Sequence, residues 1–136
     1  MKLILDKTNF KFGETIKGKA FLDLKEATKA RGVRAVFYGE EETTSYSSKG
    51  GKTSIRRVNE IKIMLEEGEK DYRTKEYEFE IGIPQYTPIN TGAKIDLGLL
   101  SLNLGGKTST VKWFIEASLD IPMGFDVSKK IQLNIV

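Results

Sequence analysis

Apolar and polar residues alternate along most of this chain, and this period of two limits the possible folds more than any other feature. The apolar sets are Leu3 and Leu5; Ile16, Gly18, Ala20, Leu22 and Leu24; Val33, Ala35, Phe37 and Gly39; Ile61, Ile63 and Leu65; Tyr77, Phe79, Ile81 and Ile83; Val111, Trp113, Ile115, Ala117, Leu119 and Ile121; and Ile131, Leu133 and Ile135. Successive side chains of a strand point to opposite faces, so each segment predicts a strand with one apolar face. The sequence therefore predicts about seven strands.

A sheet with one apolar face must cover that face, and no segment of the sequence has the pattern of an amphipathic helix that could do so. Two antiparallel sheets packed face to face satisfy every segment at once. Sheets buried on both faces would show continuous apolar runs instead. We therefore predict an all-β, two-layer antiparallel β-sandwich, and the length of 136 residues fits a single domain over residues 1–136.

The composition excludes several kinds of chemistry. The chain has no cysteine and no histidine, which rules out a disulfide, a thiolate nucleophile and serine–histidine–aspartate catalysis. The 22 basic and 19 acidic residues are interleaved and nearly balanced, so we expect no nucleic acid as a partner. A mechanism that uses only carboxylates or lysine stays open. We predict that the protein is not an enzyme and uses no cofactor or metal.

The start of the chain and its apolar runs indicate where it works. The N-terminal stretch reaches Lys2 and Asp6 too soon for a signal peptide. No apolar run approaches the roughly 20 residues of a membrane helix. We expect a cytoplasmic protein without a membrane span.

Local turn chemistry gives finer expectations. Gly13 suits a turn with positive φ, and Gly18 and Gly39 allow either close approach of the opposite sheet or a bulge. Trp113 is in the inward phase and is expected in the core. Residues 67–71 are expected to form a turn, and residues 25–30 either a helical turn or a loop.

Between Pro84 and Thr110 the alternation fails. Prolines and glycines here surround five leucines, namely Leu97, Leu99, Leu100, Leu102 and Leu104. One interpretation is that these leucines cap the open end of the sandwich or add a short strand or helix. The other is an exposed apolar patch for a partner, for self-association or for peripheral contact with a membrane. These leucines are candidate partner-binding residues.

A second candidate surface is basic. It consists of Lys49, Lys52, Arg56 and Arg57, at the tip of a predicted hairpin and on the strand leaving it. It is either a solvated hairpin or a site for a phosphate, an acidic peptide or anionic lipid. The acidic residues 40–42 on the entering strand are expected to form cross-strand ion pairs with it, and Glu76, Glu78 and Glu80 to pair with lysines across their sheet.

Several motifs occur together in one order. They are FGETIKG at 12–18, KARGVRAVFYGE at 29–40, YEFEIGIP at 77–84, VKWFIEASLDIP at 111–122 and FDV at 125–127. In order and spacing they resemble the N-terminal domain of the arrestins, most closely the α-arrestin branch. The bacterial sporulation-control proteins and the retromer subunit of the same fold are more distant comparisons. The resemblance spans nearly the whole chain.

The resemblance implies an immunoglobulin-like sandwich of the arrestin N-domain type, acting as a non-catalytic adaptor that binds proteins through loops and edges. The sequence departs from the family in three ways: it has one such domain instead of two, it lacks paired lysines on the first strand, and it has no PPxY motif. Receptor-trafficking functions therefore do not transfer. Because a second domain would cover part of the first, we expect a homodimer, formed through an edge strand or the 97–104 segment.

Three function classes remain. The first is the protein-binding scaffold. The second is a module for small ligands or carbohydrates, for which the outward aromatic candidates are Tyr38, Tyr46, Tyr86 and Phe114. The third is a carboxylate-dependent enzyme, which would need two acidic groups facing each other in a pocket.

Overall fold

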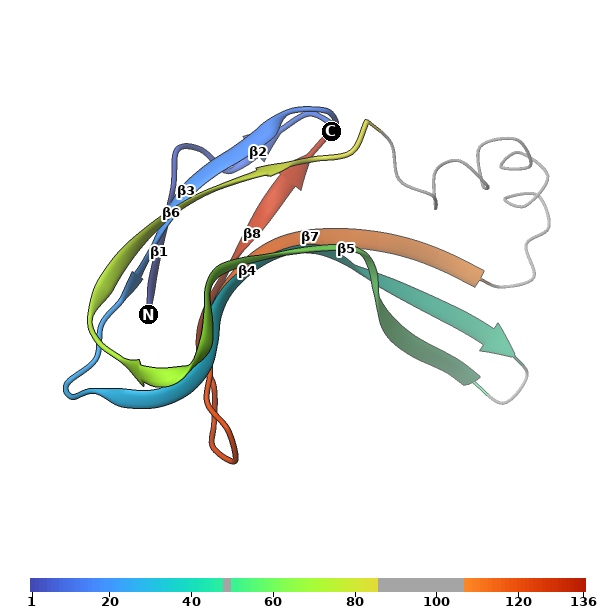
Figure 1. The fold of residues 1–136 in the computed structure, drawn as a ribbon. Helices are drawn as coiled ribbons and strands as arrows, with labels where there is room; N and C mark the ends of the chain where they lie inside the picture. Colours follow the sequence, from blue (N-terminus) through green and yellow to red (C-terminus); the bar gives the residue numbers. More distant parts are fainter. Residues whose placement is uncertain (48–49, 86–106) are drawn as a thin grey trace.

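The computed structural model describes residues 1–47, 50–85 and 107–136 (Figure 1). Within these ranges the protein is all-β. The strands are β1 (Lys2–Leu5), β2 (Asn9–Phe10), β3 (Thr15–Leu22), β4 (Thr28–Ser47), β5 (Gly50–Tyr72), β6 (Lys75–Gly82), β7 (Lys107–Asp120) and β8 (Val127–Ile135). The described residues include no helix able to cross a membrane.

The strands form two sheets that pack face to face, which confirms the predicted β-sandwich (Figure 1). The smaller sheet has the order β1-β3-β6, and the larger has the order β2-β8-β7-β4-β5. Neighbouring strands are antiparallel except β2 and β8, which pair in parallel through two residues each. The larger sheet is therefore mixed rather than purely antiparallel.

The inner faces of the two sheets hold the core, as the alternation predicts. Fully buried side chains come from both layers, with Ile16 and Leu22 on β3 facing Phe37 on β4 and Ile115 on β7. The Trp113 ring stacks on Phe37 with centroids 5.4 Å apart, which confirms its expected place in the core. Burial of these apolar side chains is the main favourable contribution to stability.

Two inward glycines make close approaches, but to neighbouring strands of their own sheet and not to the opposite sheet, and Gly39 also borders a register shift between β4 and β5. A Cβ atom on Gly18 would lie 2.7 Å from the Leu5 side chain, and one on Gly39 would lie 2.8 Å from the Trp113 ring. Gly13 has a φ of 94°, the positive value that its turn predicts.

Strand β5 is interrupted by three register shifts against β4, between Ala30/Gly32, Val33/Arg34 and Phe37/Gly39. Asn59 and Gly68 have positive φ on the bulged strand. The turn predicted at residues 67–71 is therefore wrong, because Gly68 sits in a bulge and pairing continues to Tyr72. Of the two alternatives for residues 25–30, the loop is correct for residues 25–27 only, because strand β4 starts at Thr28.

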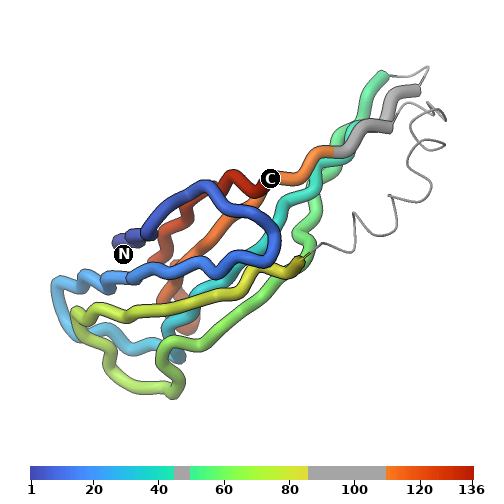
Figure 2. Tube along the Cα trace, turned by 90° about the horizontal axis from the view of Figure 1, so that it is seen from above, coloured from blue at the N-terminus to red at the C-terminus, as the bar shows by residue number. Residues whose placement is uncertain are grey.

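Three strands continue well past the sandwich as an arm (Figures 1 and 2). We define the arm as residues 41–47 of β4, 50–57 of β5 and 107–112 of β7, which pair with one another in one unbroken register. The hairpin predicted around residues 47–52 is confirmed as the β4–β5 pairing. The segment between Pro84 and Thr110, where the sequence loses its alternation, includes the first residues of strand β7, which starts at Lys107; residues 86–106 lie outside the described ranges.

The contact of Gly39 with Trp113 gives a test of the packing at this end of the core. Gly39→Ala is expected to destabilise the protein by about 1–3 kcal/mol, because the added methyl group overpacks the indole ring. Gly82→Ala is the matched control, since a Cβ atom added there would meet nothing within 4 Å, and it should change stability by less than about 0.5 kcal/mol. Urea unfolding measures both; equal losses would contradict the close contact.

Candidate partner-binding surfaces

The structure does not gather the predicted basic residues into one cluster. Arg56 and Arg57 are neighbours in a strand, so they face opposite sides of the sheet. Arg56 Nε lies 2.7 Å from Glu41 Oε1, whereas Arg57 lies 3.1 Å from Glu60 and over the Tyr38 ring. Lys52 is exposed on the arm. Lys49 and the candidate leucines 97, 99, 100, 102 and 104 lie outside the described residues.

The Glu41–Arg56 pair marks where the core ends and the arm begins. Glu41 follows Phe37 and Gly39 in the inward phase of β4, and although it is charged it is only 8% exposed. The guanidinium of Arg56 donates a hydrogen bond to its carboxylate and so compensates for the loss of water. The expected pairing of the 40–42 acids with the basic strand is correct for Glu41, whereas Glu40 pairs with Lys130 at 3.7 Å.

A small second cluster lies on the outer face of the larger sheet. Tyr38 and Phe114 stack across β4 and β7 with centroids 5.5 Å apart, and Val36 is buried beside them. Arg57 lies 3.7 Å from the Tyr38 centroid, and Lys130 lies 4.7 Å from that of Phe114. Burial raises the pKa of the Tyr38 hydroxyl, and the charge of Glu116 adds to this effect.

This cluster corrects the expectation of exposed outward aromatics. Tyr38 is 1% exposed because the charged side chains above it lay their alkyl stems and cationic groups across the rings. The side chains of Tyr46 and Tyr86 lie outside the described residues. Tyr38 and Phe114 therefore offer no open stacking platform for a sugar.

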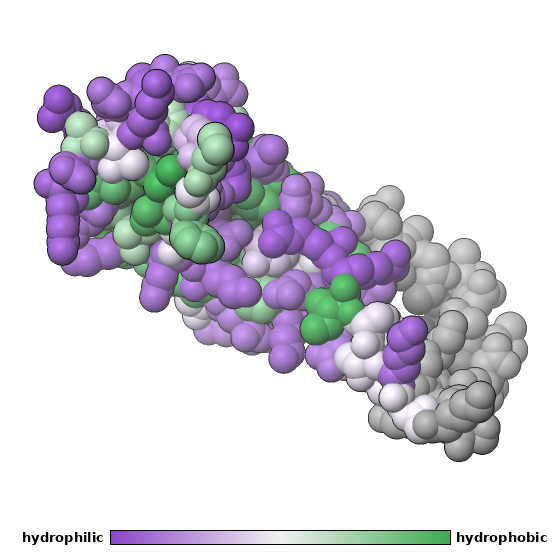
Figure 3. Space-filling model, turned by 90° about the horizontal axis from the view of Figure 1, so that it is seen from below, coloured by the Kyte–Doolittle hydropathy of each residue, from purple (hydrophilic) through white to green (hydrophobic). Residues whose placement is uncertain are grey.

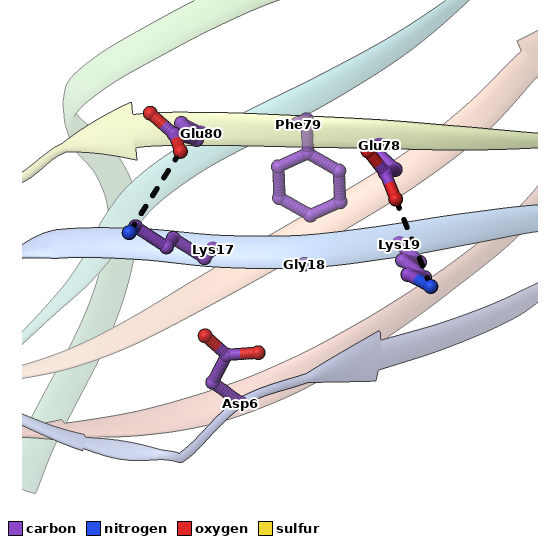
Figure 4. A pocket seen from close by; sticks show the side chains of 7 residues that line it. All are labelled: Asp6, Lys17, Gly18, Lys19, Glu78, Phe79 and Glu80. Atoms are coloured by element: carbon purple, nitrogen blue, oxygen red, sulfur yellow. Dashed lines mark ion pairs between the residues drawn. The ribbon is translucent and has the colours of Figure 1, made fainter.

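The outer face of the smaller sheet carries a ladder of charged side chains (Figure 4). Lys17 lies 4.0 Å from Glu80, and Lys19 lies 3.8 Å from Glu76 and 3.7 Å from Glu78. These pairs confirm that the β6 glutamates pair with lysines across the sheet. Opposite charges at neighbouring cross-strand positions stabilise such a sheet modestly.

A shallow, open hollow of about 390 Å³ lies over this ladder (Figure 4). Its lining residues are Asp6, Lys17, Gly18, Lys19, Glu78, Phe79 and Glu80. The lysines and glutamates in it already pair with one another, which leaves the Asp6 carboxylate as the single lining charge without an ion pair among the described residues. No group of acidic side chains suited to a metal ion occurs among the described residues.

Glu66 lies in a second polar cluster, where β5 bends towards β6. The register shift at Val33/Arg34 adds one residue to β5, so Glu66 pairs with the inward residue Val33 instead of facing outward as the alternation predicts. Its carboxylate accepts a hydrogen bond from the Tyr77 hydroxyl and forms ion pairs with Lys70 and Lys75.

These partners shift the titration of the cluster. The hydrogen bonds from Lys70 and Tyr77 hold the pKa of the Glu66 carboxyl at about 2, and the charges of Lys70 and Lys75 add to the effect. The pKa of Tyr77 is raised, first by burial and then by its bond to Glu66. The cluster lines a hollow of about 210 Å³, and its geometry is that of a structural tie between β5 and β6.

The loop that joins β7 to β8 projects away from the sandwich (Figure 1), and two of its apolar side chains are exposed to solvent. Met123 is 106% and Phe125 97% exposed. Elsewhere most of the face seen from below is hydrophilic, with apolar side chains in small separate groups (Figure 3). Neither residue is among the candidate binding residues predicted from the sequence. The sequence feature that could have identified them is the presence of two large apolar residues within a turn.

The loop is held in place at both ends. Asp126 Oδ1 accepts a hydrogen bond from the Ile121 N–H at 3.0 Å, and its other oxygen lies 3.4 Å from the Arg34 guanidinium. Arg31 and Arg34 also pair with Asp120 at 3.0 and 3.8 Å. Met123 has a φ of 57°, a value rare for a bulky residue, and the bonds around it hold that conformation.

Comparison with known proteins gives evidence on the fold alone. No family model and no curated protein matches the chain. Among solved structures, it is similar to the crystal structure of Spo0M, a sporulation control protein from Bacillus subtilis, with a TM-score of 0.65 and 17% sequence identity. The match covers 98% of this chain and 47% of Spo0M, so the chain spans about half the length of that protein. The likeness supports an arrestin-like fold.

The depressed pKa of Glu66 predicts how stability depends on pH. A carboxyl that titrates near 4.5 when unfolded and near 2 when folded contributes stability above pH 4.5, and this contribution is lost as pH falls towards 2. Because the cluster is at the surface, solvent screening limits the loss to on the order of 1 kcal/mol.

Glu66→Gln should therefore flatten the decline in stability between pH 4.5 and 2, measured by urea unfolding at a series of pH values. Glu67→Gln, an exposed neighbour, is the control and should keep the decline. A Glu66→Gln protein with the same acid dependence as the wild type would show that the cluster does not set it.

Proposed function

We propose that this domain is a non-catalytic, protein-binding adaptor of the arrestin type, and that the β7–β8 loop is one of its contact points. The observation that carries the proposal is the complete exposure of Met123 and Phe125 on a loop fixed by ion pairs. Large apolar side chains gain roughly 1.5–3 kcal/mol each on burial, so a partner with an apolar pocket would be stabilised by both.

The fixed loop favours binding because less freedom is lost on association. Asp126 and Arg34 already hold the turn, so the entropic cost of ordering it is reduced. Aromatic side chains and methionine are also enriched in protein interfaces relative to other surfaces. An anchor of this kind suits a partner protein that presents a matching cavity.

The alternative of a small-ligand or carbohydrate module has less support. Small-molecule sites are concave and mostly apolar, whereas the two hollows described above are open and lined largely by paired charges. Tyr38 and Phe114 are covered by cations. The description of Spo0M as a sporulation control protein is in keeping with a regulatory role. The cytoplasmic location and the homodimer expected from the sequence stay predictions.

Affinity capture from a native cell extract tests the loop. The double variant Met123→Ser, Phe125→Ser should weaken capture of specific partners by roughly several hundredfold, since two central apolar anchors of about 2 kcal/mol each together contribute about 4 kcal/mol. The control is Ile4→Ser on the outer face of β1, where the side chain is also exposed, at 60%. Thermal unfolding should show that both proteins remain folded.

Two results would contradict the proposal. In the first, the double variant captures the same proteins in the same amounts as wild type. In the second, vesicles containing anionic lipid bind wild type and not the double variant while no protein is lost, which would assign the loop to a membrane surface.

A further inference from the structure

The arm ends in an exposed edge strand. Over residues 51–57, β5 pairs with β4 on one side in an unbroken register, from Gly51 opposite Tyr46 to Arg57 opposite Glu40. On its other side no described strand pairs with it, since β5 is the last strand of its sheet. An edge strand of this kind presents backbone N–H and C=O groups to an incoming strand.

The remainder of β5 is built differently. Beyond Arg57 it carries all three register shifts, and Asn59 and Gly68 have positive φ. Bulges bend an edge strand and break its hydrogen-bonding row, which prevents another strand from pairing along it. The free edge of β5 is therefore regular over residues 51–57, whereas the bulges after Arg57 prevent another strand from pairing along the rest of it.

The regular part of the edge has a strongly biased charge. Residues 51–57 contain Lys52, Arg56 and Arg57 and no acidic residue, and Ile55 is 61% exposed among them. Lys52 and Arg56 occupy one face of the strand and Arg57 the other. An added strand would therefore meet cations on both of its faces.

Of the two acidic residues that balance this charge, Glu60 pairs with Arg57 from β5 itself, beyond the regular part of the edge, and Glu41 lies one strand further away. Glu41 pairs with Arg56 from β4, so it would be about 10 Å from a strand added to β5, compared with about 5 Å for the cations. Lys52 forms no ion pair with any described residue. Cross-strand neighbours dominate the electrostatics of a sheet, so the incoming strand experiences a positive edge.

We propose that residues 51–57 of β5 bind an extended, acidic segment of a partner protein, which adds a strand to the arm. The backbone supplies the affinity and the cations select the sequence, the general scheme of β-strand addition. A second copy of this chain fits less well, because self-pairing would bring the basic residues of two identical edges together. This inference rests on the proposed protein-binding function but concerns a surface other than the loop.

A peptide titration tests it. The probe is a short synthetic peptide with blocked ends in which glutamate alternates with valine, and the comparison peptide carries lysine in place of glutamate. Nuclear magnetic resonance follows the backbone amides of the full chain. The acidic peptide should shift the amides of residues 51–57 and slow their hydrogen exchange, with little effect on residues 58–71, and the basic peptide should bind at least tenfold more weakly.

A charge-reversal pair sharpens the test. Lys52→Glu should weaken binding of the acidic peptide by about threefold to tenfold, as expected for one cross-strand charge reversed. Lys62→Glu is the control, because Lys62 is exposed on the same strand beyond the bulge at Asn59, and it should change binding by less than about twofold.

The inference is overturned if the acidic peptide leaves the 51–57 amides unchanged, if both peptides bind equally, or if Lys52→Glu has no effect. Protection of these amides that grows with protein concentration in the absence of peptide would assign the edge to a second copy instead. The titration does not involve Met123 or Phe125, so it can fail while loop-dependent capture succeeds, and the converse result is equally distinguishable.

Discussion

The structure depends on a mismatch in length between its two sheets. The inner face of β4, β5 and β7 is longer than the three-stranded sheet that covers it, so on β7 the buried core ends at Trp113, with the partly buried Val111 packed against it. Beyond that point an inward-facing side chain cannot pack against the smaller sheet. The inward-facing Glu41 forms an ion pair with Arg56 instead. The same mismatch leaves the arm without a covering sheet among the described strands, and thereby exposes its edge.

Much of the fold follows from the sequence because each strand has one face in the core. The alternation identifies β3, β4, β6, β7 and β8 and the inward place of Trp113, and glycine chemistry identifies the turn at Gly13. Bulges are the main source of error. An extra residue in β5 reverses the phase of Glu66 and replaces the expected turn at residues 67–71 with continued pairing. Such a shift depends on contacts with β4 that are far away in the chain.

The candidate surfaces are less accessible to sequence reasoning. A run of basic residues in the sequence predicts a basic surface patch, but adjacent residues of a strand face opposite sides of the sheet. Their contacts also come from another strand: Glu41 pairs with Arg56, and the Tyr38 ring lies beneath Arg57. Tyr38 has an outward phase and is nevertheless buried, by Arg57 from β5 and Phe114 from β7. The exposure of Met123 and Phe125 depends on a loop held by Arg34, a residue that lies far earlier in the chain.

The stack of Trp113 on Phe37 also has a spectroscopic consequence. The chain has one tryptophan, and its indole lies in the core at the root of the arm, edge-on to Phe12 and parallel to Phe37. Its fluorescence therefore arises from a single apolar environment and reports the packing of that region alone. Emission should shift to longer wavelength when water reaches the boundary between core and arm, giving an intrinsic optical probe of this junction without any label.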